Sequence, residues 1–168
     1  YDFFQTGTYD KNREFVLTTS PSMDILISSN LERLIYLICG EDSEKTKELM
    51  EELKTTGKYT ITPEMKEKLA DFAAGYSTEE ETAESIHDTY QKTGYVMDTH
   101  TAVAAHVCGQ YRVKSGDQTK CVIASTASPY KFVKSVMSAI DAENANADEF
   151  DLLPKLQEVS GVPMPQAI

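Results

Sequence analysis

The chain has 168 residues, and 40% of them are hydrophobic, which suffices for one core of ordinary domain size. Asp and Glu number 27 against 16 Lys and Arg, and the net charge of −11 argues against nucleic acid or an anionic membrane surface as a partner. No stretch approaches the roughly 20 apolar residues of a transmembrane helix and no signal-peptide pattern is present, so we expect a cytoplasmic protein.

The cysteines and histidines do not follow a metal-ligand pattern. Cys39, Cys108 and Cys121 are widely spaced in apolar surroundings, which predicts free buried thiols rather than disulfides. Cys108 lies near His106 and His100, but no second pair completes four ligands at zinc-site spacing. We therefore expect no metal site.

The first 40 residues predict two helices separated by irregular chain. The chain begins at Tyr1 in what reads as a helix already under way and ending at Gly7, so we expect a piece of a longer protein. An extended segment over 14–18 and a loop over 20–28 should follow. A second helix is expected from a Ser29 cap to Gly40. Its apolar residues are Leu31, Leu34, Ile35 and Ile38.

Residues 41–94 are charged and mostly helical in pattern. One helix should end at Gly57, residues 59–61 are extended, and a Thr62–Pro63 start predicts a helix to about Leu69. Residues 72–76 are expected to form a short strand. The inward-facing apolar residues of the first helix are Leu49, Met50 and Leu53.

A further helix of this region is predicted by Ser77 and Glu80, which have the spacing of a capping box. We expect Ala83, Ile86 and Tyr90 on its inner face and His87 on its exposed face. The acidic runs are typical of solvated helix faces.

The segment 95–143 carries the most informative pattern. Asp98 should cap a helix over 99–111 with Val103 and Val107 inward, and residues 120–125 read as a buried apolar strand. That strand would deliver Ser125 and Thr126 to the start of another helix. Ser128 and Pro129 fit its N-cap and N1 positions. Its apolar stripe is Phe132, Val133, Val136, Met137 and Ile140.

A strand end followed by a helix N-terminus brings hydroxyls, backbone N–H groups and a partial positive charge together, which suits an anionic ligand. A plain capped junction without a ligand is the alternative interpretation. A polar linker over 144–147, a last amphipathic helix and an irregular tail should complete the chain. The last helix carries Leu152, Leu153, Leu156 and Val159.

Three motifs in order resemble the C-terminal part of threonine synthase, a pyridoxal-phosphate (PLP) enzyme of fold type II in the tryptophan-synthase-β-like class. They are Ser-Pro-Ser-Met-Asp-Ile at 20–25, Tyr-Val-Met-Asp-Thr-His-Thr at 95–101 and Thr-Ala-Ser-Pro-Tyr-Lys-Phe at 126–132, and Thr-Gly-Thr-Tyr-Asp at 6–10 precedes them. The resemblance covers nearly the whole chain. This chain departs from the family where Thr99 replaces a proline and Ser128 replaces a histidine.

The resemblance implies an α/β, mostly helical segment with few strands, and conversion of O-phospho-L-homoserine and water to L-threonine and phosphate with PLP. It implies that the Thr126 hydroxyl meets the pyridine nitrogen, with Ser125 beside it. Asp98 and His100 would line the mouth of the site, although a plain helix cap explains Asp98 equally well. The substrate-site candidates are Asp98, His100, Ser20, Asn30 and Lys131.

Two family features are absent from the sequence. The glycines are isolated rather than gathered in a phosphate-binding run, and no lysine stands in the Phe-Lys-Asp context of the Schiff-base lysine. We therefore expect no catalytic residue here, one wall of a site, an inactive isolated segment, and a partner in the missing N-terminal part of the same protein.

Four functional segments follow from this interpretation. They are 1–40 as the end of the large PLP-domain region, 41–94 as a charged helical insertion, 95–143 as the active-site region, and 144–168 as a C-terminal helix and tail. A non-catalytic small-anion-binding or regulatory domain of the same family is the alternative, and a helical interaction module is the third interpretation.

Overall fold

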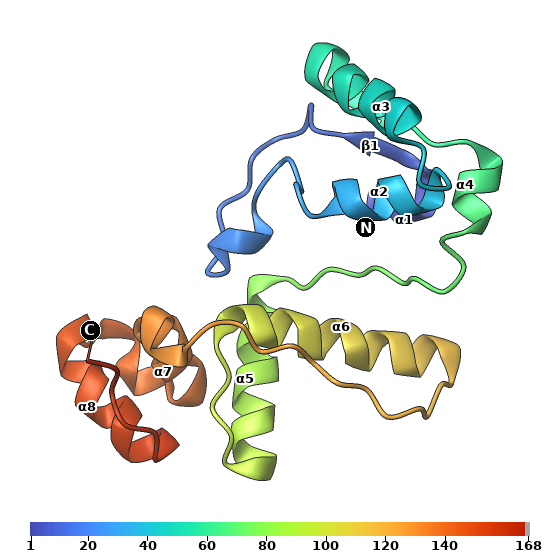
Figure 1. Ribbon diagram of the computed structural model, residues 1–168. Coiled ribbons are helices and arrows are strands. Elements are labelled where there is room, and N and C mark those ends of the chain that lie inside the picture. Colours follow the sequence, from blue (N-terminus) through green and yellow to red (C-terminus); the bar gives the residue numbers. More distant parts are fainter. Residues whose placement is uncertain (167–168) are drawn as a thin grey trace. The chain divides into compact units, whose positions relative to one another are not determined.

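The computed structural model describes residues 1–166, and the chain divides into two compact units (Figure 1). The first unit comprises Tyr1–Leu17 and Asp24–Gly75, and the second comprises Thr18–Met23 and Tyr76–Ile168. The short segment 18–23 therefore belongs with residues far along the sequence. The four functional segments stay a prediction, because compact packing and functional division are different properties.

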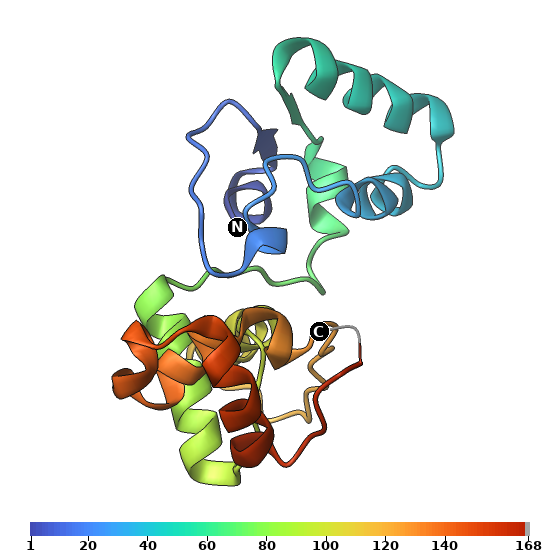
Figure 2. The ribbon, with the colours of Figure 1, turned by 90° about the vertical axis from the view of Figure 1, so that its left-hand side faces the viewer.

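The first unit combines short helices with one small sheet (Figure 2). Strands β1 and β2 pair antiparallel, with Thr8 opposite Thr60 and Tyr9 opposite Tyr59. The Thr62 hydroxyl caps the last helix by accepting the Met65 N–H at 3.3 Å. The elements are α1 (Asp2–Thr6), β1 (Thr8–Asp10), α2 (Leu31–Ile38), α3 (Ser43–Thr56), β2 (Lys58–Thr60) and α4 (Pro63–Glu67).

The core of the first unit is centred on aromatic side chains. Tyr9 and Tyr59 stack with ring centroids 5.6 Å apart, and the Phe3 ring meets Tyr59 edge-on at 6.0 Å. Burial raises the pKa of the Tyr59 phenol. The sequence predicts no strand at β1. Its three residues form one by pairing with β2, where the sequence predicts extended chain.

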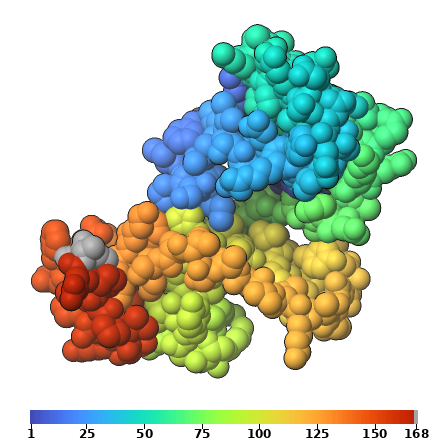
Figure 3. Space-filling view, in the orientation of Figure 1, coloured from blue at the N-terminus to red at the C-terminus, as the bar shows by residue number. Residues whose placement is uncertain are grey.

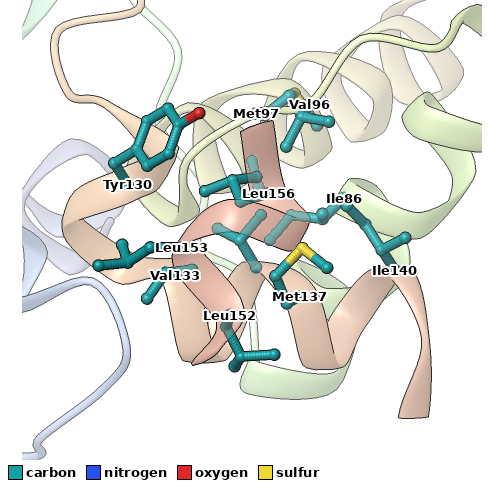
Figure 4. Packing of buried hydrophobic residues seen from close by; sticks show 12 residues of the cluster. Ile86, Val96, Met97, Tyr130, Val133, Met137, Ile140, Leu152, Leu153 and Leu156 are labelled. Carbon is teal, nitrogen blue, oxygen red and sulfur yellow. The ribbon is translucent and has the colours of Figure 1, made fainter. Parts of the chain in front are cut away.

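The second unit is a helical assembly in which α5 packs against α6 and α7, and α7 packs against α8 (Figure 1). Figure 4 shows its core, where side chains of α7 and α8 meet Ile86 of α5 and the chain before α6. The α-helices are α5 (Glu79–Thr93), α6 (Thr99–Ser115), α7 (Val133–Ile140) and α8 (Glu149–Ser160). The 3₁₀ helices are η1 (Pro21–Met23), η2 (Pro129–Phe132) and η3 (Ala142–Asn146).

Several local predictions for this unit are confirmed. Ser128 caps η2 by accepting the Tyr130 N–H at 3.3 Å, and Asp98 caps α6. The expected stripe of α7 is buried, apart from Phe132, which is partly covered. Buried stripe residues of the last two helices are Val133, Val136, Met137, Ile140, Leu152, Leu153 and Leu156.

The strand expected over 120–125 is wrong. These residues have no regular secondary structure and form part of the exposed surface in Figure 3 (orange), where Val122 is 97% exposed. A strand exists only by hydrogen bonding to a neighbour. No other part of the described chain pairs with this segment, so its apolar side chains remain in solvent.

Other expectations need smaller corrections. The capping box uses Thr78 and Glu81 rather than Ser77 and Glu80, one residue further along the chain. Asn30, not Ser29, precedes α2, and its side chain makes no capping bond. Residues 72–76 form no strand.

The inner face of α6 also differs from the expected one. Val103 and Val107 are only half-buried, whereas Ala102 is buried in the core and the half-buried Ala105 packs against it. The helix continues to Ser115, four residues beyond the expected end, and Gly116 terminates it in the left-handed region at φ 73°.

The three cysteines are free thiols, but they are not buried as expected: Cys39 and Cys108 are half-buried and Cys121 is exposed. A side-chain hydrogen bond with Cys121 raises the pKa of the Cys108 thiol. Among the described residues, no helix has the length and apolar character needed to cross a bilayer.

Candidate functional site

The start of α6 is built on the buried carboxylate of Asp98, which is 1% exposed. Its Oδ1 accepts the backbone N–H of His100 at 2.9 Å and that of Thr101 at 3.3 Å. Its Oδ2 accepts the hydroxyl proton of Thr101. Asp98 thus occupies the N–H groups of His100 and Thr101 in the first turn, and these two are not available to an external anion.

Thr101 connects this carboxylate to the loop that follows α6. Its Oγ1 lies 3.0 Å from the Oγ of Ser125, 24 residues further along the chain. Thr101 is buried whereas Ser125 is exposed. The three side chains of Asp98, Thr101 and Ser125 therefore form a hydrogen-bonded chain from the interior to the surface, which we call the carboxylate–hydroxyl chain.

The His100 ring lies between this carboxylate and the segment 18–23. Its Nε2 accepts the backbone N–H of Ser22 at 3.2 Å, and its Nδ1 lies 3.3 Å from Oδ1 of Asp98. A neutral imidazole whose Nε2 accepts a hydrogen bond carries its proton on Nδ1, from which it can donate a hydrogen bond to the carboxylate. Phe132 covers the ring, with centroids 4.8 Å apart.

The segment 18–23 is held against α5 and α6 by further bonds. The Thr99 hydroxyl donates to the Thr19 carbonyl at 2.9 Å, across 80 residues of sequence, and the Thr19 N–H donates to the Glu79 carboxylate at 3.3 Å. Ser20 is 1% exposed, and its Oγ has no hydrogen-bond partner among the described residues. A buried hydroxyl without a partner is costly and uncommon.

The structure brings together four of the predicted site residues. Ser20 lies in the segment that the first turn of α6 holds, while Asp98, His100 and Ser125 are linked through the bonds above. Thr126 directly follows Ser125 and is exposed.

Two predicted site residues, Lys131 and Asn30, are not part of this hydrogen-bonded group of described residues. Lys131 is exposed on η2, with its Nζ 5.7 Å from the centroid of the Phe132 ring. Asn30 belongs to the first unit, where it is exposed at the start of α2.

Sequence reasoning missed Thr99, Thr101 and Phe132 as parts of this arrangement. The spacing of Asp98 and Thr101 carried a signal, because an N-cap side chain faces the residue three positions later. The contacts of Thr99 with Thr19 and of His100 with Phe132 had no such signal, since they depend on tertiary packing.

The functional groups gathered at this site are hydroxyl groups next to a buried carboxylate. Both oxygens of Ser128 are used within η2, by the N–H groups of Tyr130 and Lys131. The junction therefore presents the Ser125 and Thr126 hydroxyls rather than those backbone N–H groups. Within residues 1–166, no three metal-ligating side chains gather at one place.

Known proteins resemble this chain in sequence and in structure. The sequence model of the family described as "Threonine synthase, C-terminal" matches residues 101–166. Threonine synthase-like 1 of Homo sapiens is 36% identical over 96% of this chain, which spans 22% of that protein. Threonine synthase of Saccharomyces cerevisiae is 35% identical over 91% of this chain and 33% of its own length.

Two solved structures have a similar fold over most of this chain. The crystal structure of threonine synthase from yeast matches with a TM-score of 0.78 and 32% identity, over 96% of this chain and 35% of the yeast chain. PLP-bound threonine synthase from Brucella melitensis matches with a TM-score of 0.73 and 38% identity, over 82% of this chain and 29% of that one. These similarities confirm the predicted fold class, a mostly helical α/β segment. The chain belongs to the threonine synthase family and matches the C-terminal part of those enzymes.

Proposed function

We propose that this chain forms the C-terminal part of an enzyme that converts O-phospho-L-homoserine and water to L-threonine and phosphate with PLP. The observation that carries the proposal is its 38% identity and common fold with a PLP-bound threonine synthase. The cytoplasmic location stays a prediction.

The residues of this chain fit one side of a PLP ring. Thr126 is exposed, and its neighbour Ser125 is hydrogen-bonded to Thr101, which in turn is bonded to the buried Asp98. A neutral hydroxyl can donate a hydrogen bond to the pyridine nitrogen without favouring its protonation, as a carboxylate would. PLP, when bound, supplies the electron sink that stabilises negative charge on the substrate carbon.

In this proposal, Thr126 and Ser125 bind the cofactor and the first turn of α6 holds them in place. His100 fastens the segment 18–23, which carries Ser20, through the 3.2 Å bond from the Ser22 N–H. Asp98, His100, Ser20 and Lys131 are proposed to lie on the substrate side, and the role of Asn30, which belongs to the other compact unit, stays a prediction. Lys131 is the one cation in this set and is suited to the phosphate of the substrate.

The remaining parts of the site are proposed to come from the rest of the protein. Five of the glycines that a phosphate cradle would need instead terminate helices in the left-handed conformation. They are Gly7, Gly57, Gly94, Gly116 and Gly161. The segment alone is therefore expected to be inactive.

The test is turnover by the full-length protein that contains this chain. Purified with PLP and supplied with O-phospho-L-homoserine, it should release phosphate and threonine in equal amounts, and the segment alone should release neither. If the full-length protein bound phosphate or the substrate without turnover, the proposed enzymatic activity would be refuted. That result would support the anion-binding or regulatory alternative.

A further inference from the structure

The two cysteines of the second unit lie side by side, although they are 13 positions apart in the sequence. Cys108 is on α6 and Cys121 is in the chain that follows it, and a side-chain hydrogen bond joins the two thiols. Cys121 is exposed, whereas Cys108 is half-buried. One thiol is therefore open to reagents in solution, and the second is in direct contact with it.

Hydrogen bonds tie the segment 117–121 to the last turns of α6. The Arg112 guanidinium donates to the Thr119 carbonyl at 2.7 Å. The Tyr111 hydroxyl donates to the Asp117 carboxylate at 3.3 Å. The contact between the thiols therefore belongs to a larger set of bonds between the helix and the returning chain.

The register of these contacts places the cysteines opposite each other. The Arg112–Thr119 bond lies on one side of the pair, and the 3.0 Å contact between the Thr101 and Ser125 hydroxyls lies on the other. From the first of these contacts to the cysteines, the helix runs four residues and the returning chain two. Four helical residues and two nearly extended ones cover about the same length, roughly 6 Å.

We propose that Cys108 and Cys121 are a reversible disulfide site held ready by Arg112, in which Cys121 reacts with a peroxide and Cys108 resolves the product. The Cys121 thiolate attacks one oxygen of hydrogen peroxide, the O–O bond breaks, and a sulfenic acid and water are formed. The Cys108 sulfur then attacks the sulfenic sulfur, whose hydroxyl leaves with the Cys108 proton as a second water. The two thiols are oxidised to a disulfide, and the peroxide is reduced to two molecules of water.

The surroundings of the two thiols suit these roles. A solvent-accessible cysteine beside a resolving cysteine is a common arrangement in redox-sensing pairs. The hydrogen bond with Cys121 raises the pKa of the Cys108 thiol, and the positive charge of Arg112 acts against this shift by favouring the thiolate. A small dithiol reverses the reaction by thiol–disulfide exchange, so in a reducing compartment the bond is transient.

The test is peroxide treatment of the native full-length protein that contains this chain, followed by N-ethylmaleimide in denaturant and tryptic mapping. Trypsin cleaves after Arg112, Lys114 and Lys120, so the two cysteines fall in different peptides unless a disulfide joins them. We expect joined peptides that lack two hydrogen atoms and that dithiothreitol separates. Recovery of both cysteines as N-ethylmaleimide adducts, or linked only to another protein molecule, would overturn the proposal.

Cysteine variants show whether the pair is specific. Cys121→Ser should abolish the joined peptides and return Cys108 as an N-ethylmaleimide adduct. Cys39→Ser is the matched control, because Cys39 is also half-buried but belongs to the first unit, and the yield of joined peptides should not change. A yield that fell equally in both variants would contradict a site made of Cys108 and Cys121.

The role of Arg112 is tested by the rate of disulfide formation. Arg112→Met removes the bond to Thr119 and the charge beside Cys108, so the rate should fall by roughly 5-fold or more, an ordinary coupling between contacting residues. Lys114→Met removes a charge from the exposed end of the same helix and should leave the rate unchanged. Equal rates in the two variants would refute the role of Arg112.

The readout is a covalent bond between two peptides and requires neither PLP nor turnover. A full-length protein that forms the disulfide but does not convert O-phospho-L-homoserine therefore refutes the proposed function and supports this site. A protein with turnover and no disulfide does the reverse.

Discussion

At the residue scale, the surroundings of Ser125 and Thr126 differ although the two are adjacent. Ser125 is bonded to Thr101, and Thr126 projects into solvent without such a bond. If the cofactor nitrogen meets Thr126, removal of that single hydroxyl must weaken the interaction, and its neighbour must matter less.

Thr126→Val in the full-length protein tests this assignment. The change keeps the shape of the side chain but leaves the pyridine nitrogen without a hydrogen-bond donor, at a cost on the order of 1–3 kcal/mol. We expect a loss in kcat/KM of roughly 5- to 150-fold. Thr126→Ser should retain most activity, and Thr126→Asp should be worse than Val because a carboxylate favours a protonated ring nitrogen.

Ser125→Ala is the control for that series and should have the milder effect. If Ser125→Ala abolished turnover and Thr126→Val changed neither turnover nor the cofactor spectrum, the contact would belong to Ser125. If neither change mattered, the loop would be a plain capped junction.

A second prediction concerns the stability that Asp98 provides. Asp98→Ala removes the cap of α6 and leaves the buried Thr101 hydroxyl without its acceptor, so the free energy of unfolding should fall by about 2 kcal/mol or more. Asp42→Ala is the matched control, since Asp42 is an exposed cap whose side chain accepts only the Lys45 N–H, at 3.0 Å. Denaturant titration of the 168-residue chain should show the larger loss for Asp98→Ala, and equal losses would contradict the account of a buried network.

At the element scale, α5 illustrates how a helix is defined by its first turn. The Thr78 hydroxyl accepts the Glu81 N–H at 3.2 Å, and the Glu81 carboxylate accepts the Thr78 N–H at 2.8 Å. This backbone bond, together with nearby His106, holds the pKa of the Glu81 carboxyl below its usual value.

The sign of the resulting pH dependence follows from that lowered pKa. A group whose pKa is lowered by folding stabilises the protein above its unfolded pKa of 4.5, and this contribution is lost as pH falls through the folded value. We expect the urea concentration at the unfolding midpoint to decrease as the pH is lowered below about 4.5. In the Glu81→Gln variant this decrease should be less steep. Glu80→Gln removes one negative charge from the same turn but leaves the Glu81 capping bond in place. If the midpoint depended on pH in the same way in both variants, this role of Glu81 would be contradicted.

At the scale of the whole molecule, many large apolar side chains are exposed to solvent. Val122 is 97% exposed, Leu17 77% and Ile25 58%. Apolar residues exposed in this way often mark surfaces that contact other chain segments. In the proposed enzyme, the part of the protein outside this chain would supply such segments.

The isolated chain should form no specific covalent bond with PLP, because no lysine in it stands in the Phe-Lys-Asp context of the Schiff-base lysine. Mixed with PLP and reduced with borohydride, it should give scattered labelling of surface lysines in a peptide map. One stoichiometric adduct at a single lysine would contradict the proposal that the cofactor lysine lies elsewhere in the protein. The full-length protein treated in the same way is the positive control.

Local chemistry made much of this chain predictable from sequence. The α7 stripe, the caps at Asp98, Thr62 and Ser128 and the helix ends at Gly7 and Gly57 were confirmed, because each depends on residues within a few positions of one another. The ordered motifs indicated the family for the same reason, since motifs are read along the chain.

Tertiary packing governed the features that depend on distant residues. The segment 120–125 has the composition of a buried strand, yet it lies exposed because a strand needs a hydrogen-bonded neighbour that the described chain does not provide. The meeting of Thr19 with Thr99, and of Ser22 with His100, joins positions about 80 residues apart, and no periodicity in the sequence encodes such a contact. Residue types and spacing therefore predicted the helices and most of their caps, whereas long-range packing and hydrogen bonding placed the site residues together.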